Sequence, residues 1–99
     1  MTLTPRYSLD VQWDVEQCVE YFESQSDSVA DRFRDAVAKT VRMLCDNPEM
    51  GELLRSDLTG QIRRRTILGF GNYLIFYRRV DTTLEIVRVI HGAMDGEPF

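Results

Sequence analysis

The chain has 99 residues, which is enough for one hydrophobic core but not for two, so we expect one domain over residues 1–99. Hydrophobic residues make up 43% of the chain and charged residues 28%, a balance that excludes a disordered protein. The formal net charge of -4 argues against a general nucleic-acid coat protein.

The N-terminal segment "TLTPRYSL" predicts a short strand, which Pro5 limits to an edge of a sheet or to the strand's own beginning. From Leu9 to about Glu23 apolar residues recur every three or four positions, which predicts a helix with an apolar face made of Val11, Val15, Cys18, Val19 and Phe22. We expect the other side of this helix to be acidic, with Asp14, Glu16, Glu20 and Glu23. Neither a signal peptide nor a membrane helix is indicated, so we expect a cytoplasmic protein.

The segment "SQSDS" interrupts this pattern, and Ser28 followed by Asp31 predicts the cap of a second helix. Its apolar positions keep helical spacing for about four turns and stop at "DNP", because Pro48 offers no amide hydrogen. The short link predicts that the two helices pack as an antiparallel hairpin. Cys18 and Cys45 lie on the apolar stripes, and we expect small core residues rather than a disulfide.

The segment "PEMGELLRSDLTGQ" predicts a loop, followed by three strands over Gln61 to Leu68, Asn72 to Arg79 and Thr83 to His91. The second of these strands is apolar on both faces, which predicts a place in the middle of the sheet. Alternation in the last strand places Arg88 with Leu84, Ile86 and Ile90, and His91 with Glu85, Val87 and Val89. The elements predict an α+β fold of order β-α-α-β-β-β, with the helix hairpin on one face of a small, curved, mostly antiparallel sheet.

Four segments carry a family resemblance: "SVADRFRDAV", "LCDNPEMG", "IRRRTILGFGNYLIFYR" and "EIVRVIHGAMD". Over roughly Val11 to Asp95 the chain resembles the toxins of the RelE/ParE superfamily of type II toxin-antitoxin systems, and within it the ParE branch. The resemblance implies the fold described above and a hetero-oligomer with a cognate antitoxin, which lays an extended or helical segment across the toxin. Toxins of the ParE type poison DNA gyrase, whereas those of the RelE type cut mRNA in the ribosomal A site.

The two branches differ in the residues that their chemistry needs. Cleavage of RNA beside its 2′-hydroxyl requires a proton acceptor, a proton donor and cations that stabilise the phosphorane. Toxins of the RelE type commonly have an arginine where this chain has Tyr73, and many end near a tyrosine or histidine, whereas this chain ends in "MDGEPF". These departures favour an inhibitor of DNA gyrase that is not an enzyme. The alternatives are a ribosome-dependent mRNA endoribonuclease that uses His91 with Arg63 and Arg65, and an inactive relative that only binds its antitoxin.

Basic residues are distributed unevenly, because residues 1–57 hold 12 acidic and 6 basic side chains and residues 58–99 hold 4 and 6. An anionic partner should therefore meet the C-terminal part. Alternation sends Arg63 and Arg65 to one face and Arg64 to the other. This arginine run can be a solvated, charge-protected edge, a partner contact or a catalytic cluster. For Arg88, pairing with a carboxylate at the edge of the core is favoured over catalysis.

The aromatic and histidine candidates also have structural interpretations. Tyr73 and Tyr77 share a face and pack in the sheet or, if that face is open, form an aromatic platform for the antitoxin. For His91 we favour a structural hydrogen bond at the end of its strand, ahead of a partner contact and of acid-base catalysis. The residue pattern indicates neither a metal nor a cofactor. The candidates for antitoxin or target contact are Arg63, Arg64, Arg65, Tyr73, Tyr77, Arg78, Arg88 and His91.

Overall fold

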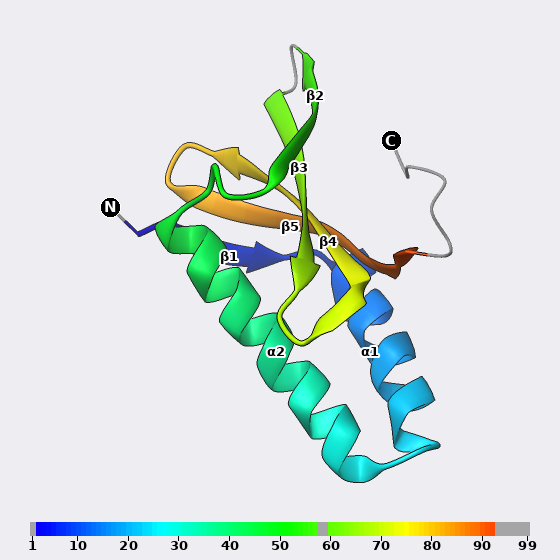
Figure 1. Ribbon diagram of the computed structural model, residues 1–99. Helices are drawn as coiled ribbons and strands as arrows, with labels where there is room; N and C mark the ends of the chain where they lie inside the picture. Colours follow the sequence, from blue (N-terminus) through cyan, green and yellow to red (C-terminus); the bar gives the residue numbers. More distant parts are fainter. Residues whose placement is uncertain (1, 58–59, 93–99) are drawn as a thin grey trace.

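Two helices and five strands make up the computed structural model, which describes residues 2–57 and 60–92 (Figure 1). In chain order the elements are β1 (Thr4–Tyr7), α1 (Leu9–Glu23), α2 (Asp27–Asp46), β2 (Glu52–Asp57), β3 (Gly60–Ile67), β4 (Phe70–Val80) and β5 (Thr83–His91). The α+β class, both helices and the three predicted C-terminal strands are confirmed.

The strands form a single sheet in the order β1-β5-β4-β3-β2. The strand β1 runs parallel to β5, and the other three pairings are antiparallel. As predicted, β4 is the central strand and β1 lies at an edge. The helix hairpin packs on one face of this sheet, and the β2–β3 hairpin extends away from the helices (Figure 1).

The prediction of a loop over "PEMGELLRSDLTGQ" is wrong, because this segment contains the edge strand β2. Leu53 lies opposite Arg63 and Asp57 opposite Gly60, with a register shift between Leu53 and Arg55. The segment has no regular alternation of its own, so its pairing with β3 is what makes it a strand. Charged residues on such an edge oppose pairing with other chains.

The helix starts differ from one another in how they are capped. The Ser8 hydroxyl accepts a hydrogen bond from the Val11 amide at 3.2 Å, which caps α1. The predicted cap of α2 at Ser28 is wrong, because α2 already begins at Asp27 and its N-cap is Ser26. The Ser26 side chain makes no cap hydrogen bond, and its Oγ lies 3.1 Å from Oγ of Ser28. Ser26 and Ser28 are both residues of the kind that caps a helix, so the sequence pattern does not decide which of the two is the N-cap.

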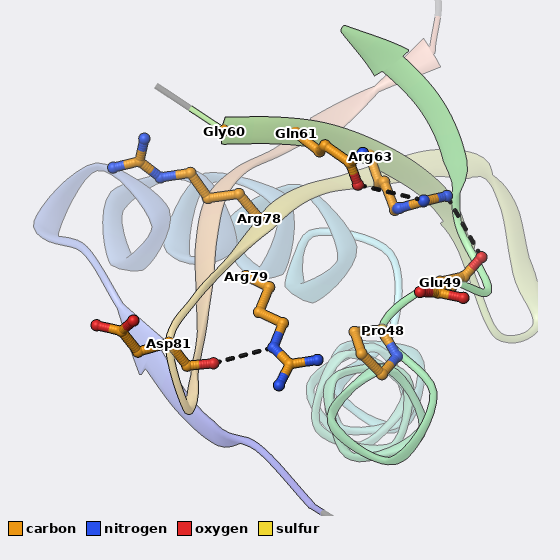
Figure 2. Close-up of a pocket in the computed structure, with 8 residues that line it drawn as sticks. All are labelled: Pro48, Glu49, Gly60, Gln61, Arg63, Arg78, Arg79 and Asp81. Carbon is orange, nitrogen blue, oxygen red and sulfur yellow. Dashed lines mark hydrogen bonds between the residues drawn. The ribbon is translucent and has the colours of Figure 1, made fainter. Parts of the chain in front are cut away.

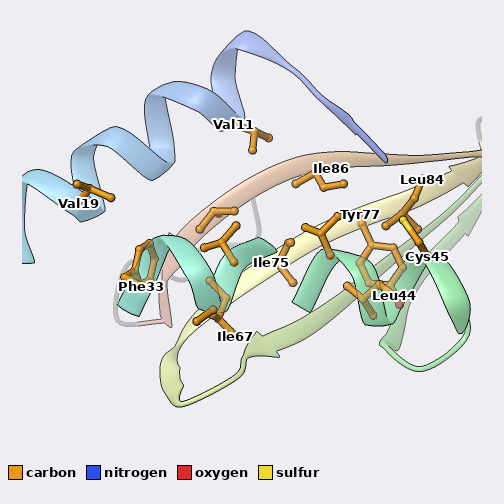
Figure 3. Packing of buried hydrophobic residues seen from close by; sticks show 14 of the residues in the cluster. Val11, Val19, Phe33, Leu44, Cys45, Ile67, Ile75, Tyr77, Leu84 and Ile86 are labelled. Atoms are coloured by element: carbon orange, nitrogen blue, oxygen red, sulfur yellow. The ribbon is translucent and has the colours of Figure 1, made fainter. Parts of the chain in front are cut away.

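The core lies between the helix hairpin and the sheet. Figure 3 shows side chains from α1, α2 and the central strands converging there, among them Val11, Phe33, Leu44, Ile75 and Ile86. An aromatic group, in which ring centroids lie 5.1–5.4 Å apart, closes one end and consists of Phe22, Phe33, Phe70 and Tyr73. Both cysteines are free thiols, and Cys45 is buried in this core. The preference for core residues over a disulfide is confirmed.

A bulge changes the face assignments in β5. Phe76 lies opposite Arg88, whereas the next residue, Tyr77, lies opposite Ile86, so the register shifts by one residue at this point. Consequently Ile86 and Val89 both join the core, although strict alternation separates them. The predicted grouping of Arg88 with Ile86 is therefore wrong, since Arg88 shares its face with Phe76.

Candidate functional site

An arginine-lined cavity of about 410 Å³ lies where α2 ends, beside β3 and the turn between β4 and β5 (Figure 2). The residues that line it are Pro48, Glu49, Gly60, Gln61, Arg63, Arg78, Arg79 and Asp81. We call it the arginine cavity. Arg63 Nη1 donates to the Gly51 carbonyl at 2.9 Å and to the Glu49 carbonyl at 3.4 Å, and Arg79 Nε donates to the Asp81 carbonyl at 2.9 Å.

The arginine run of β3 divides between the two faces of the sheet as predicted. Arg63 lies opposite Tyr77 and Arg65 opposite Ile75, on the side of the helices, whereas Arg64 lies opposite Phe76. Arg65 Nη1 donates to the Met50 carbonyl at 3.1 Å, so Arg63 and Arg65 both fasten the segment before β2. Arg64 forms an ion pair with Glu52 at 3.1 Å.

Arg78 lies on the same face as Arg64 and contacts a carboxylate across the β4–β5 ladder. Its Nε and Nη2 both lie 2.9 Å from Glu85 Oε1. In Figure 2 its side chain points away from Arg63 and Arg79. The positive charge of Arg78 is therefore largely compensated where it stands.

Tyr77 is a structural residue rather than part of an open platform. Its side chain is 1% exposed, its hydroxyl donates to the Pro48 carbonyl at 2.8 Å, and it accepts from the Gly51 amide at 2.8 Å. Burial is the main cause that raises the pKa of this phenol. Of the two interpretations of Tyr73 and Tyr77, packing in the sheet is the one observed, because the helices cover this face and the open face that an aromatic platform requires is not present here. Tyr73 is half-buried, and its pKa is also raised, chiefly by burial.

Arg88 is paired with a carboxylate, as predicted, and the partner is Asp14 of α1. The guanidinium donates from Nε to Asp14 Oδ2 at 2.7 Å and from Nη2 to Oδ1 at 2.8 Å. The hydrogen bond to Asp14 is the main cause that raises the pKa of Arg88. The expectation that Asp14 faces solvent is wrong, since this residue is 7% exposed.

The reason for burying Asp14 lies at the edge of β5. The pairing with β1 ends at Ile86, so the β5 amides beyond it face no neighbouring strand on that side. Asp14 Oδ2 accepts a hydrogen bond from the Val89 amide at 3.0 Å and thereby takes the place of a strand partner. Helical periodicity cannot reveal this contact, because it depends on where β1 stops.

His91 is the last residue of β5, as expected from the sequence. Its ring packs edge-on against Tyr73, with centroids 4.9 Å apart and an interplanar angle of 86°. Both line a cavity of about 390 Å³ that also includes Trp13, Tyr21 and Arg88.

The structure does not bring the nuclease candidates together. His91 lies opposite Tyr73 and Arg63 opposite Tyr77, which places them about 13 Å apart along the strands and two strands apart. Arg63, Arg65 and His91 also line three different cavities. One phosphate cannot be within hydrogen-bonding reach of all three in this arrangement.

Sequence reasoning missed an apolar groove of about 510 Å³ between α1 and α2. We call it the helix groove; its lining includes Tyr7, Leu9, Trp13, Val15, Val37 and Ala38, with Glu16 and Arg34 among the polar residues. Leu9 is 81% exposed and Trp13 65% exposed. The signal in the sequence that could have indicated the groove is the spacing of four residues between Leu9 and Trp13, which places both on one side of α1, away from its main apolar face.

Metal sites and membrane-spanning helices are both absent from residues 2–57 and 60–92. In these ranges no three His, Cys, Asp or Glu side chains gather closely enough to hold a metal ion. Within the same ranges neither helix has both the length and the apolar character that crossing a membrane requires.

Comparison with known proteins identifies the family. A family model described as ParE toxin of type II toxin-antitoxin system, parDE, matches residues 6–96. Among solved structures, the fold is similar to a chromosomal ParDE toxin-antitoxin system from P. aeruginosa, with a TM-score of 0.73 and 13% identity over 91% of this chain and 96% of that one. It is also similar to the toxin-antitoxin complex RelBE2 from Mycobacterium tuberculosis, with a TM-score of 0.59 and 23% identity over 92% and 99% of the two chains.

These structural likenesses concern the fold alone, and no curated protein gave a significant match. The family match, in contrast, covers most of the sequence and agrees with the resemblance carried by its motifs. The chain therefore belongs to the ParE toxin family of type II toxin-antitoxin systems.

Proposed function

We propose that this chain is a cytoplasmic toxin that inhibits DNA gyrase and is neutralised by a cognate antitoxin. The observation that carries the proposal is the match to the ParE toxin family over residues 6–96. On this proposal the toxin acts by binding to gyrase and stabilising its complex with cleaved DNA, so that the toxin itself makes and breaks no covalent bond.

The geometry around His91 supports a toxin without catalytic activity. The histidine ring packs against Tyr73, while Arg63 and Arg65 lie two strands away from it and are held by backbone carbonyls. A ribonuclease of this fold would need its proton-transfer group and its cations around one phosphate.

Gyrase inhibition is tested with purified toxin in a supercoiling assay and a DNA-cleavage assay. We expect loss of supercoiling and accumulation of cleaved DNA, both relieved by equimolar antitoxin. If excess toxin leaves gyrase unaffected but cuts translated mRNA, and if His91→Ala abolishes the cutting, the toxin is instead an endoribonuclease.

We further propose that the antitoxin covers the helix groove with an apolar segment. Leu9 and Trp13 offer a large exposed apolar surface beside the walls formed by Val15 and Val37. Aromatic residues in such a setting commonly dominate binding energies. On this proposal the antitoxin is the partner that supplies the apolar segment, because the toxin has to be neutralised by a bound protein.

The antitoxin contact can be tested with Trp13→Ser, for which Tyr21→Ser is a matched control. Tyr21 is an exposed aromatic residue of the same helix but does not line the groove. We expect Trp13→Ser to weaken antitoxin binding by about tenfold or more and Tyr21→Ser to leave it nearly unchanged. Equal losses in the two variants would place the antitoxin elsewhere on α1.

A further inference from the structure

The arginine cavity contains two cations, Arg63 and Arg79, that form no ion pair with a carboxylate among the residues that the structure describes. Arg63 donates to the Gly51 and Glu49 carbonyls and, at 3.4 Å, to Oε1 of Gln61. Arg79 donates to the Asp81 carbonyl. Neutral oxygens orient a guanidinium but leave its positive charge in place.

Two carboxylates, those of Glu49 and Asp81, also line the cavity, but neither forms an ion pair with Arg63 or Arg79 in the described part of the chain. Arg78 also lines the cavity, but it is paired with Glu85. Figure 2 shows the Asp81 carboxylate pointing away from the Arg79 guanidinium, although its backbone carbonyl holds Arg79 in place. The cavity therefore presents two oriented guanidinium groups that form no ion pair among the described residues, with the Glu49 and Asp81 carboxylates in the same lining.

From these observations we propose that the arginine cavity binds a phosphate group and that the backbone of DNA supplies it. Guanidinium groups match the geometry of phosphate oxygens and stay charged at every physiological pH. The proposal concerns the toxin alone and holds whether or not gyrase proves to be its target.

The composition of the lining selects the source of the phosphate. None of the eight residues that line the cavity in Figure 2 is aromatic, so the base of a free nucleotide would find no side chain to stack on. Pro48 is the one large apolar residue among them, which leaves little to anchor a peptide. A backbone phosphate needs only cations and hydrogen-bond donors.

The charge distribution of the chain sets the expected strength. The cavity is formed largely by the part of the chain with more basic than acidic residues, whereas the formal net charge of the whole chain is -4. Binding should therefore be weak and should fall steeply as salt is added.

The test is fluorescence anisotropy of a labelled 12-base-pair duplex titrated with the full chain at low salt. Arg79→Gln removes one cation at an exposed site and should weaken binding about tenfold, with a salt dependence shallower by about one unit of slope. Arg32→Gln removes the same charge from an exposed position near the other end of α2 and should leave affinity within about twofold.

A third variant moves the affinity in the opposite direction. Asp81→Asn removes a negative charge at the rim while keeping a residue that tolerates the positive φ of 55° at this turn. We expect duplex binding to tighten about twofold, as for a unit charge acting through water. Thermal unfolding of each variant verifies that the fold is intact.

Several results would overturn the proposal. These are no duplex binding by the wild-type chain at low salt, equal losses in Arg79→Gln and Arg32→Gln, or no gain in Asp81→Asn. Competition experiments with ADP and with inorganic phosphate test whether the bound phosphate group comes from the DNA backbone. If either competes as strongly as unlabelled duplex, the cavity is a site for small phosphates rather than for a DNA backbone.

Discussion

Replacing Asp14 by alanine should destabilise the fold strongly, although sequence periodicity places this residue on the solvent side of its helix. The carboxylate accepts two hydrogen bonds from Arg88 and one from the buried Val89 amide. The Asp14→Ala variant removes all three acceptor contacts at once and leaves the Val89 amide without an acceptor at the free edge of β5.

The magnitude follows from the burial of each partner. A buried amide that loses its acceptor costs about 1–3 kcal/mol. Breaking a fully buried ion pair would cost more, but the Arg88 side chain is 38% exposed, so water can hydrate it and this part is reduced to about 1 kcal/mol. The sum is about 2–4 kcal/mol, and a loss of 3 kcal/mol lowers Tm by about 12–24 °C in a domain of this size.

Urea and thermal unfolding followed by circular dichroism measure this effect. Glu20→Ala is the matched control, since it removes an exposed carboxylate from the same helix and should change the free energy of unfolding by less than about 0.5 kcal/mol. Asp14→Asn retains an acceptor oxygen for the Val89 amide, so its free energy of unfolding should lie between those of Asp14→Ala and Glu20→Ala. The reasoning is refuted if Asp14→Ala is as stable as Glu20→Ala.

Further predictions concern the segment before β2 and the thiol on α1. Alanine at Gly51 would place its Cβ 2.8 Å from Cε1 of Tyr77, so Gly51→Ala should cost about 1–3 kcal/mol in urea unfolding. Tyr77→Phe should cost about as much, because the Gly51 amide loses its acceptor, and the double variant should lose less than the sum. Burial, followed by the charge of Asp14, raises the pKa of Cys18 from 9.0 to about 11. The pKa of the Cys18 thiol is higher in the folded state than in the unfolded state, so the folded state favours the protonated thiol. The resulting contribution to the free energy of unfolding is complete below pH 9 and is lost as the pH rises to about 11. In a Cys45→Ala background, modification of Cys18 by a thiol reagent should become faster between pH 9 and about 11. Asp14→Asn should shift this increase to lower pH, and an unshifted profile would exclude the influence of Asp14 on the thiol.

The elements that could be predicted are those whose residues specify them locally. The helix over Leu9–Glu23 has the predicted start and ends at about the predicted position, because its apolar spacing and its polar flanks agree. The central strand was predictable because a run that is apolar on both faces has to be covered on both sides. In contrast, β2 becomes a strand only through its partner β3, and no pattern within the segment encodes that partner.

For the candidate site, sequence assigned faces correctly in β3 but could not tell which face the helices cover. Arg63 and Arg65 share a face as predicted, and that face is the covered one. Tyr77 lies on the same side, which is why it is buried rather than available to a partner. The bulge opposite Phe76 then changes the alternation of β5, which depends on contacts between strands and is invisible in either strand alone.

The two ends of the β4–β5 ladder serve different purposes, and this separation bears on the function of the toxin. At one end Tyr73 and His91 close the aromatic group of the core. At the other end Arg79 extends beside the end of α2, where Arg63 is held by backbone carbonyls. Transfer of protons at a phosphate requires acid-base and cationic groups at the same atoms, whereas binding to a phosphate requires the cations alone. The separation of His91 from Arg63 and Arg79 along this ladder therefore supports the proposal that the toxin acts by binding its target complex.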